Sequence, residues 1–359
     1  RLFYPPETML LRHSKPVRSL LRPTSSLMST EAIPTSSMPF ISPIENSPKS
    51  TSKYNPGIPL DTHWLESTNV NHAGLLRRAS EISGRRTVKK ANQAAWLLRA
   101  ISCIDLTTLS GDDTQGNVRR LCAKAKNPVR RDIMEKLGVP HDFVTTGAVC
   151  VYPARVQDAV EALEGTGIPV ASVATGFPSG QIKTEHKLLE IEQCVADGAR
   201  EIDIVLSRDL VLQGKWDQVY EEVKLFKKAC GNAEMKIILA TGELATFSNV
   251  YKASLVCMMA GADFIKTSTG KEPVNATLPV SLCMLRAIRD YHDKTGFRVG
   301  YKPAGGISTA KDALTYLALV KDELGDSWLN NEMFRFGASS LLNDCERQLY
   351  HNAFGQYAA

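Results

Sequence analysis

The sequence lacks the patterns that mark metal-binding, disulfide-rich and membrane proteins. Its eight cysteines include no C-x-x-C pair, and its seven histidines form neither H-E-x-x-H nor H-x-H. We therefore expect no metal site and no disulfide framework. No apolar run approaches the ~18 residues that a transmembrane helix needs, so no membrane partner is expected. Reduced thiols indicate a reducing compartment, and the cytoplasm fits best.

A concentrated basic surface is also missing. The net charge is +5, but residues 1–58 hold seven Lys or Arg and three acids, and so account for +4 of it. The remaining body is nearly neutral, whereas binding to a phosphodiester backbone needs a basic face. The densest basic run, RRTVKK (residues 85–90), is typical of a solvated helix face. The sequence therefore predicts no nucleic-acid partner.

The first 55 residues show no helical or strand period. They are rich in Ser, Thr and Pro, which predicts a disordered extension. Residues 1–27 are basic and nearly free of acids, so a mitochondrial transit peptide is an alternative. Met28 opens a credible alternative start, which favours the cytoplasm. Residues 56–100 carry a helical pattern and predict a helical lead-in to the body.

The chain from residue 101 to 359 alternates short apolar, β-branched runs with longer amphipathic stretches. We expect eight strands, within residues 101–109, 145–153, 169–178, 201–206, 235–244, 263–270, 299–307 and 334–340. This pattern predicts an α/β fold of the (β/α)₈ TIM-barrel type. The alternative is a doubly wound open sheet that binds a dinucleotide. Such a sheet would show G-x-G-x-x-G after its first strand, where this chain has TTLSGDD.

Two lysines end short apolar runs, Lys266 in DFIKTSTGKE and Lys302 in GYKPAGGI. Strand alternation should point both side chains into the barrel, toward Asp105 and Asp203. Burial and a second ammonium group nearby should lower a lysine's pKa toward neutrality, and a neutral lysine can form a Schiff base. The alternative is that each lysine makes a structural ion pair with an inward carboxylate.

A phosphate site is suggested by small residues at the ends of the last two strands. Gly305 and Gly306 end the seventh run, and Ser339 and Ser340 end the eighth. Glycines let backbone N–H groups approach an anion, and serines add hydroxyl donors before a helix N-terminus. The loops after strands 7 and 8 are a recurrent phosphate site of these barrels. The alternative for the glycines is a tight turn.

Taken together, the motifs of this sequence resemble those of the deoxyribose-phosphate aldolases, particularly their longer animal form. The motifs that carry the resemblance are IDLTTL, AVCVYP, EIDIVL, GADFIKTSTGK, VNAT, YKPAGGI and FGASSLL. The resemblance covers roughly residues 60–357. It implies a TIM barrel that cleaves 2-deoxy-D-ribose 5-phosphate reversibly to acetaldehyde and D-glyceraldehyde 3-phosphate. It implies no metal or organic cofactor and a small phosphorylated sugar as the partner. Barrels of this kind are often dimers, so a homodimer is expected.

The resemblance also implies a role for each matching residue. Lys266 corresponds to the Schiff-base lysine, and Asp203 to the proton-shuttling carboxylate. Lys302 corresponds to the second lysine, which lowers the pKa of the first and assists proton transfer. Asp105 would orient the lysines. The positions that match substrate contacts are Thr107, Cys150, Gly270, Lys271, Gly305, Gly306, Ser339 and Ser340. Tyr357 is near the end of the chain but not terminal, so it receives no role.

Two other functions fit parts of the pattern. A different Schiff-base aldolase or a transaldolase could share the barrel, but its lysine need not lie on strand 6 with a second lysine on strand 7. A non-catalytic binding protein could keep the fold, but it would be expected to lose Lys266, Lys302 or Asp203, and all three are present.

Overall fold

The computed structural model describes residues 55–84 and 88–357. Residues 1–54 of the predicted disordered extension, which include the alternative transit peptide, lie outside the described residues, as does half of the basic run at 85–90. Within the part that is described, no helix is both long enough and apolar enough to cross a membrane.

Eight parallel strands form one sheet in the order β7-β6-β5-β4-β3-β2-β1-β8. Their bounds are β1 Ile104–Thr107, β2 Ala148–Val151, β3 Val170–Ala174, β4 Glu201–Val205, β5 Glu234–Ile238, β6 Phe264–Lys266, β7 Gly300–Lys302 and β8 Phe336–Ala338. Parallel bridges from Tyr301 to Phe334 and from Ala304 to Gly337 bring the two edges of the sheet together. The predicted TIM barrel is therefore confirmed, with one observed strand in each predicted run.

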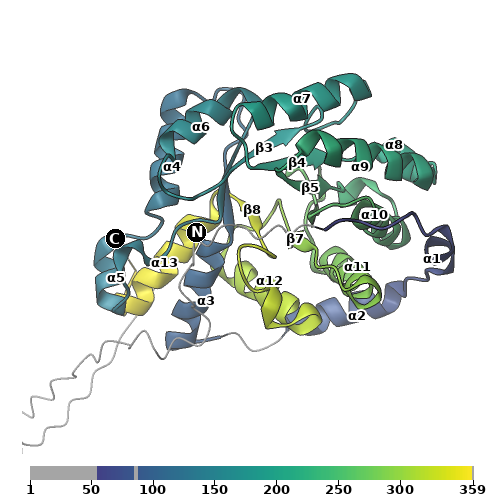
Figure 1. Cartoon of the computed structure of the whole chain (residues 1–359). Helices are drawn as coiled ribbons and strands as arrows, with labels where there is room; N and C mark the ends of the chain where they lie inside the picture. Colours follow the sequence, from purple (N-terminus) through teal and green to yellow (C-terminus); the bar gives the residue numbers. More distant parts are fainter. Residues whose placement is uncertain (1–54, 85–87, 358–359) are drawn as a thin grey trace, which may run out of the picture. The chain divides into compact units, whose positions relative to one another are not determined.

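Helices surround the strands (Figure 1). Their bounds are α1 Thr62–Ser67, α2 His72–Ser83, α3 Lys90–Ser102, α4 Gln115–Lys126, α5 Arg131–Leu137, α6 Val156–Ala162, α7 Thr184–Ala196, α8 Arg208–Leu212, α9 Trp216–Cys230, α10 Phe247–Met259, α11 Leu278–Thr295, α12 Ala310–Leu324 and α13 Leu341–Phe354. Short 3₁₀ turns lie at His141–Phe143, Pro153–Arg155, Thr241–Glu243 and Asp326–Trp328. Two helices follow β1 and two follow β4, which lengthens those βα units.

The first helices pack onto the barrel's outer layer. Asn55 is buried, and its side chain donates to Met258 O at 2.7 Å and to Ala262 O at 3.0 Å, just after α10. Asp61 and Asn71 cap α1 and α2 through hydrogen bonds from Trp64 N and Gly74 N. Capping side chains of this kind satisfy N–H groups that the first helical turn leaves free. The chain before β1 is thus attached to the body at Asn55, while α1 and α2 are each capped by a residue of their own.

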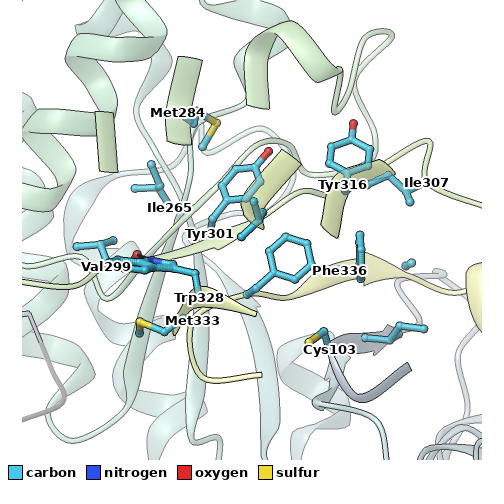
Figure 2. Packing of buried hydrophobic residues seen from close by; sticks show 14 of the residues in the cluster. Cys103, Ile265, Met284, Val299, Tyr301, Ile307, Tyr316, Trp328, Met333 and Phe336 are labelled. Atoms are coloured by element: carbon cyan, nitrogen blue, oxygen red, sulfur yellow. Dashed lines mark hydrogen bonds between the residues drawn. The ribbon is translucent and has the colours of Figure 1, made fainter. Parts of the chain in front are cut away.

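The apolar core lies between strands and helices (Figure 2). Ile265 on β6 and Tyr301 on β7 are fully buried there with Met284 of α11 and Tyr316 of α12. Because neighbouring strand residues point to opposite faces, packing of Ile265 and Tyr301 outward turns the next residues, both lysines, inward. All eight cysteines are free thiols buried in the protein, so no disulfide contributes to the fold.

Candidate active site

The lysines that end β6 and β7 meet on one carboxylate inside the barrel. Lys266 Nζ and Lys302 Nζ each donate to Asp203 Oδ2 at 2.7 Å. Lys266 and Lys302 pair directly in the strand register, and all three side chains are buried. The sequence analysis expected these residues to converge, and the structure brings them into contact at the carboxyl end of the barrel.

Asp105 on β1 joins the group from the opposite side. Its Oδ2 accepts a hydrogen bond from Lys302 Nζ, and its Oδ1 accepts one from Arg335 Nη1 at 2.6 Å. Lys302 is therefore held between two carboxylates, whereas the only ion pair of Lys266 in the described chain is with Asp203. The two lysines therefore differ in the number of carboxylates that stabilise their positive charge.

Three further buried charges lie below the lysines, and the sequence analysis missed them. Arg335 donates to Glu201 Oε1 at 2.8 Å, and Lys236 Nζ donates to Glu201 Oε2. Lys236 pairs in register with Asp203, while Glu201 lies two residues before Asp203 on the same strand face. A charge within each apolar run (EIDIVL, EMKII, FRFGASS) was the available signal.

The network keeps its members charged. Burial opposes ionisation of Asp203, but Lys266, Lys302 and Lys236 outweigh it and hold the pKa of Asp203 well below its usual range. Burial also opposes the charge on Asp105, yet Lys302, Arg335 and Lys236 lower the pKa of that carboxyl. The cations around the two aspartates therefore hold both side chains in the carboxylate form.

The pKa of Lys302 differs from that of a buried lysine whose only charged neighbour is another ammonium group. The carboxylates of Asp105 and Asp203 outweigh burial and raise the pKa of Lys302. Lys302 is thus a lasting cation and suits a proton donor or an electrostatic partner, not a nucleophile. The sequence predicted both aspartates near the two lysines, but not that Lys302 alone would contact both of them.

Arg335 should be a major stabiliser of the barrel interior. Its guanidinium bonds Asp105 and Glu201, and also donates through Nε to Asn331 O. Removing one partner of a buried ion pair leaves uncompensated charge. We expect Arg335→Met to lower the free energy of unfolding by about 3–5 kcal/mol, measured by urea denaturation. A matched change on the surface, Arg131→Met, breaks an exposed pair with Glu135 and should cost under about 1 kcal/mol.

The pocket-lining predictions fall on the first two strands. Cys150 on β2 is buried with Ala171 and Val173 of β3, and burial raises the pKa of its thiol to about 11. Thr107 ends β1, is half-buried, and donates to Asp105 O at 2.7 Å. The barrel interior thus has a small apolar wall at β2 and β3 beside the charged half.

The loop after β6 already uses its donors. Glu272 is buried, and its carboxylate accepts hydrogen bonds from Thr269 N at 3.0 Å, Thr269 Oγ1 at 2.7 Å and Gly270 N at 3.1 Å. Lys271 is exposed, and its Nζ donates to Leu109 O at 3.1 Å, bridging to the loop after β1. Sequence reasoning missed Glu272, which gives the backbone N–H of Gly270 an internal partner.

The loops after β7 and β8 are more open. Gly305 and Gly306 have φ values of +81° and +80°, and within the described residues neither N–H donates to a protein acceptor. A side chain at Gly305 would meet Asn275 at 2.6 Å, so both space and backbone conformation call for glycine. Ser339 and Ser340 are exposed, and Ser340 caps α13 without a side-chain hydrogen bond.

Nothing in the described part of the chain groups three or more His, Cys, Asp or Glu side chains as a metal ion would require.

Comparison with known proteins agrees with this geometry. Residues 99–347 match the profile of the DeoC/LacD family aldolases. The chain is 60% identical over 310 residues to the deoxyribose-phosphate aldolase of Homo sapiens, covering 86% of this chain and 98% of that protein. It is 62% identical over 305 residues to the enzyme of the same name from Mus musculus, covering 84% and 96%.

A solved structure supports the fold. A tetrameric deoxyribose phosphate aldolase from Aeropyrum pernix superposes with a TM-score of 0.53 at 23% identity, covering 78% of this chain and 98% of that one. At that identity the likeness concerns the fold alone. The family match spans every strand of the barrel and the lysine-bearing ends of β6 and β7, and it shows that this chain belongs to the DeoC/LacD family of aldolases.

Proposed function

We propose that the chain cleaves 2-deoxy-D-ribose 5-phosphate reversibly to acetaldehyde and D-glyceraldehyde 3-phosphate through a Schiff base on Lys266. The observation that carries the proposal is Asp203 Oδ2, which accepts from both Lys266 and Lys302 at 2.7 Å. A nucleophilic amine needs a base that takes its proton, and a barrel places such groups at its carboxyl end. The curated relatives carry the name of this substrate.

In the proposed mechanism, Lys266 Nζ attacks C1 of the open-chain sugar after its proton passes to Asp203. Loss of water from the carbinolamine gives an iminium, which withdraws electrons from C2. A base removes the proton of the C3 hydroxyl, the C2–C3 bond breaks, and its electron pair forms an enamine. D-Glyceraldehyde 3-phosphate leaves, C2 is protonated, and water releases acetaldehyde and free Lys266. Every proton that is taken up is returned within one turnover.

Lys302 and the apolar wall support this sequence of steps. The two carboxylates that bracket Lys302 keep it cationic, so it can stabilise the oxygen that develops negative charge and can return a proton. The wall of Cys150, Ala171 and Val173 suits the methyl end of acetaldehyde, which has no hydrogen-bonding group. The C2–C3 bond would therefore break beside the buried lysines and aspartates, and the acetaldehyde part of the sugar would lie against the apolar wall.

The phosphate of the sugar would bind to the backbone N–H groups of Gly305 and Gly306, which donate to no acceptor in the described residues. The N-terminus of the 14-residue helix α13 would add its dipole to this site. Ser339 and Ser340 supply hydroxyl donors beside that helix start. Lys271 lies across the mouth from the loop after β6 and would add a cation. Because Glu272 occupies the N–H of Gly270, the loops after β7 and β8 should contribute most of the phosphate binding.

Ser340→Glu tests this phosphate site. A glutamate at the start of α13 favours the helix, so the fold should be unharmed, but the added charge repels a phosphate. We expect KM for 2-deoxyribose 5-phosphate to rise roughly tenfold, while kcat/KM for unphosphorylated 2-deoxyribose stays unchanged. Ser340→Gln is the uncharged control of the same size. Equal losses with both sugars would place the phosphate elsewhere.

Trapping tests the reaction itself. The purified protein would be incubated with acetaldehyde, reduced with sodium borohydride and digested, and the modified peptide would be mapped by mass spectrometry. An ethyl group on Lys266 is the expected result. Turnover of 2-deoxyribose 5-phosphate would be followed in parallel by coupling acetaldehyde release to alcohol dehydrogenase. Release of a larger donor, or none, would favour another Schiff-base aldolase or a binding protein.

We also propose a cytoplasmic location, a homodimer, and an aldolase domain at residues 101–359 preceded by the lead-in at 56–100. Eight buried free thiols support a reducing compartment. Exposed Leu189, Leu212 and Leu225 on α7, α8 and α9 offer apolar surface to a second copy. Cell fractionation, light scattering, and truncation before residue 56 test these three points in turn.

A further inference from the structure

Lys236 is a fully buried lysine that no step of the proposed mechanism uses. It lies on the inward face of β5, and its Nζ donates to Glu201 Oε2. The same nitrogen is 3.5 Å from Asp203 Oδ1 and 3.9 Å from Asp105 Oδ2. The two carboxylates that hold the upper lysines thus also face a third lysine from below.

Asp203 divides its two oxygens between these cations. Oδ2 accepts from Lys266 and Lys302, whereas Oδ1 is buried without a hydrogen-bond partner and faces only the charge of Lys236. An unpaired buried oxygen is costly unless a nearby charge compensates it. Lys236 is placed to compensate Asp203 Oδ1 and leave Oδ2 to the two upper lysines.

The strand register gives the heights of these groups. Lys266 pairs with Ile238, so Lys236 lies two residues below the level of Lys266 on β5, or about 7 Å. Glu234, 4.0 Å from Lys236, lies about 7 Å lower again, at the amino end of the strand. The ring of Phe264 on β6 is 5.8 Å from Lys236 and also favours the cation.

Lys236 is a fixed cation. The carboxylates around Lys236 outweigh burial and raise its pKa, as they do for Lys302 and Arg335. In turn, the surrounding cations outweigh burial and lower the pKa of Asp105, Glu201 and Asp203. The charge of Lys236 therefore acts on the carboxylate that Lys266 contacts, from 3.5 Å.

We propose that Lys236 is a positioning residue of the aldolase: its fixed charge, acting on Asp203 and Asp105, makes Lys266 release the proton that it must lose before it attacks a carbonyl. This inference rests on the proposed function of Lys266. Without Lys236, two carboxylates would be less compensated and would hold the proton on Lys266 more firmly. Lys236 touches no reacting atom and acts only through these aspartates.

The test is the pH dependence of borohydride trapping with acetaldehyde. In Lys236→Met, the acid side of the profile should move to higher pH by on the order of one unit, while the plateau rate at high pH is kept. Lys236→Arg retains the charge and should leave the profile where it is. A profile that keeps its position in Lys236→Met and only loses rate at every pH would overturn the proposal.

Glu201→Gln provides a matched variant of opposite sign. It breaks the same buried ion pair and carries a similar risk to the fold, but it removes a negative charge. We expect the acid side of the trapping profile of Glu201→Gln to move to lower pH, which is the direction opposite to that of Lys236→Met. Shifts in the same direction, or none, would reduce both residues to structural roles. If Lys236→Met does not fold, as judged by near-UV circular dichroism, the shift of Glu201→Gln decides alone.

Failure of the proposed function would look different. The wild-type protein would then show no ethyl adduct at any pH and would match Lys266→Met throughout. The inference about Lys236 fails by itself when the wild type is trapped on Lys266 but the two variants keep the wild-type profile or shift it in the same direction.

Discussion

Replacing Lys266 with methionine should abolish both turnover and trapping. Lys266 Nζ is the amine whose only ion pair in the described chain is with Asp203, at 2.7 Å, and the proposed path has no step that avoids a bond to it. Loss of the covalent nucleophile in a protease costs on the order of 10⁶-fold in turnover, and we expect a loss of that order here. The coupled assay and borohydride trapping, run on the same preparation, measure it.

Lys187→Met is a closely matched control. Lys187 and Lys266 are each 3% exposed, and each donates to one buried carboxylate, Lys187 Nζ to Glu222 Oε1 at 2.9 Å. Lys187 lies on α7, outside the strands, so its loss should lower stability but leave trapping intact. Trapping that persists in Lys266→Met would show that another lysine is the nucleophile, and the labelled peptide would identify it.

Chemical rescue sharpens the same experiment. Lys266→Cys treated with bromoethylamine restores an amine at nearly the same reach, because a sulfur replaces one methylene. Partial recovery of turnover is expected after this treatment. Lys266→Arg restores the positive charge without a usable nucleophile and should remain inactive, which separates the need for an amine from the need for a charge.

Strand alternation explains why the inward position of the two lysines was predictable. Ile265 and Tyr301 precede Lys266 and Lys302, and apolar side chains of that size belong in the layer under the helices. The lysines therefore had to point inward, and EIDIVL placed Asp203 inward in the same way. Local sequence was sufficient for these residues because each face of a short strand is determined by its neighbours.

The lower half of the network was not predictable in the same way. Arg335 lies between Phe334 and Phe336, and only closure of the barrel brings it to Glu201, 134 positions away in the chain. Which carboxylate oxygen serves which lysine also depends on contacts between distant strands. The raised pKa of Lys302 follows from two carboxylates on β1 and β4, and no local pattern contains that information.

Asp203→Asn should give the second largest loss. The asparagine keeps the size of the side chain but cannot take a proton from Lys266, so both carbinolamine formation and its dehydration lose their base. General acid–base help is worth about 10²- to 10⁴-fold, and turnover should fall within that range. KM for the sugar phosphate should change little, because Asp203 lies below the loops proposed to hold the phosphate. Steady-state kinetics with the coupled assay measure both constants.

The control for Asp203 is Glu222→Gln. Glu222 Oε1 accepts from Lys187 at 2.9 Å and from Ser207 Oγ at 2.8 Å, so this variant also removes a buried carboxylate from a lysine. It should lower the unfolding temperature without a comparable loss of turnover. Turnover in Asp203→Asn above about a tenth of the wild-type rate would exclude Asp203 as the main proton carrier. Asp105, which holds Lys302 from the other side, would then be the remaining carboxylate in reach of the lysines.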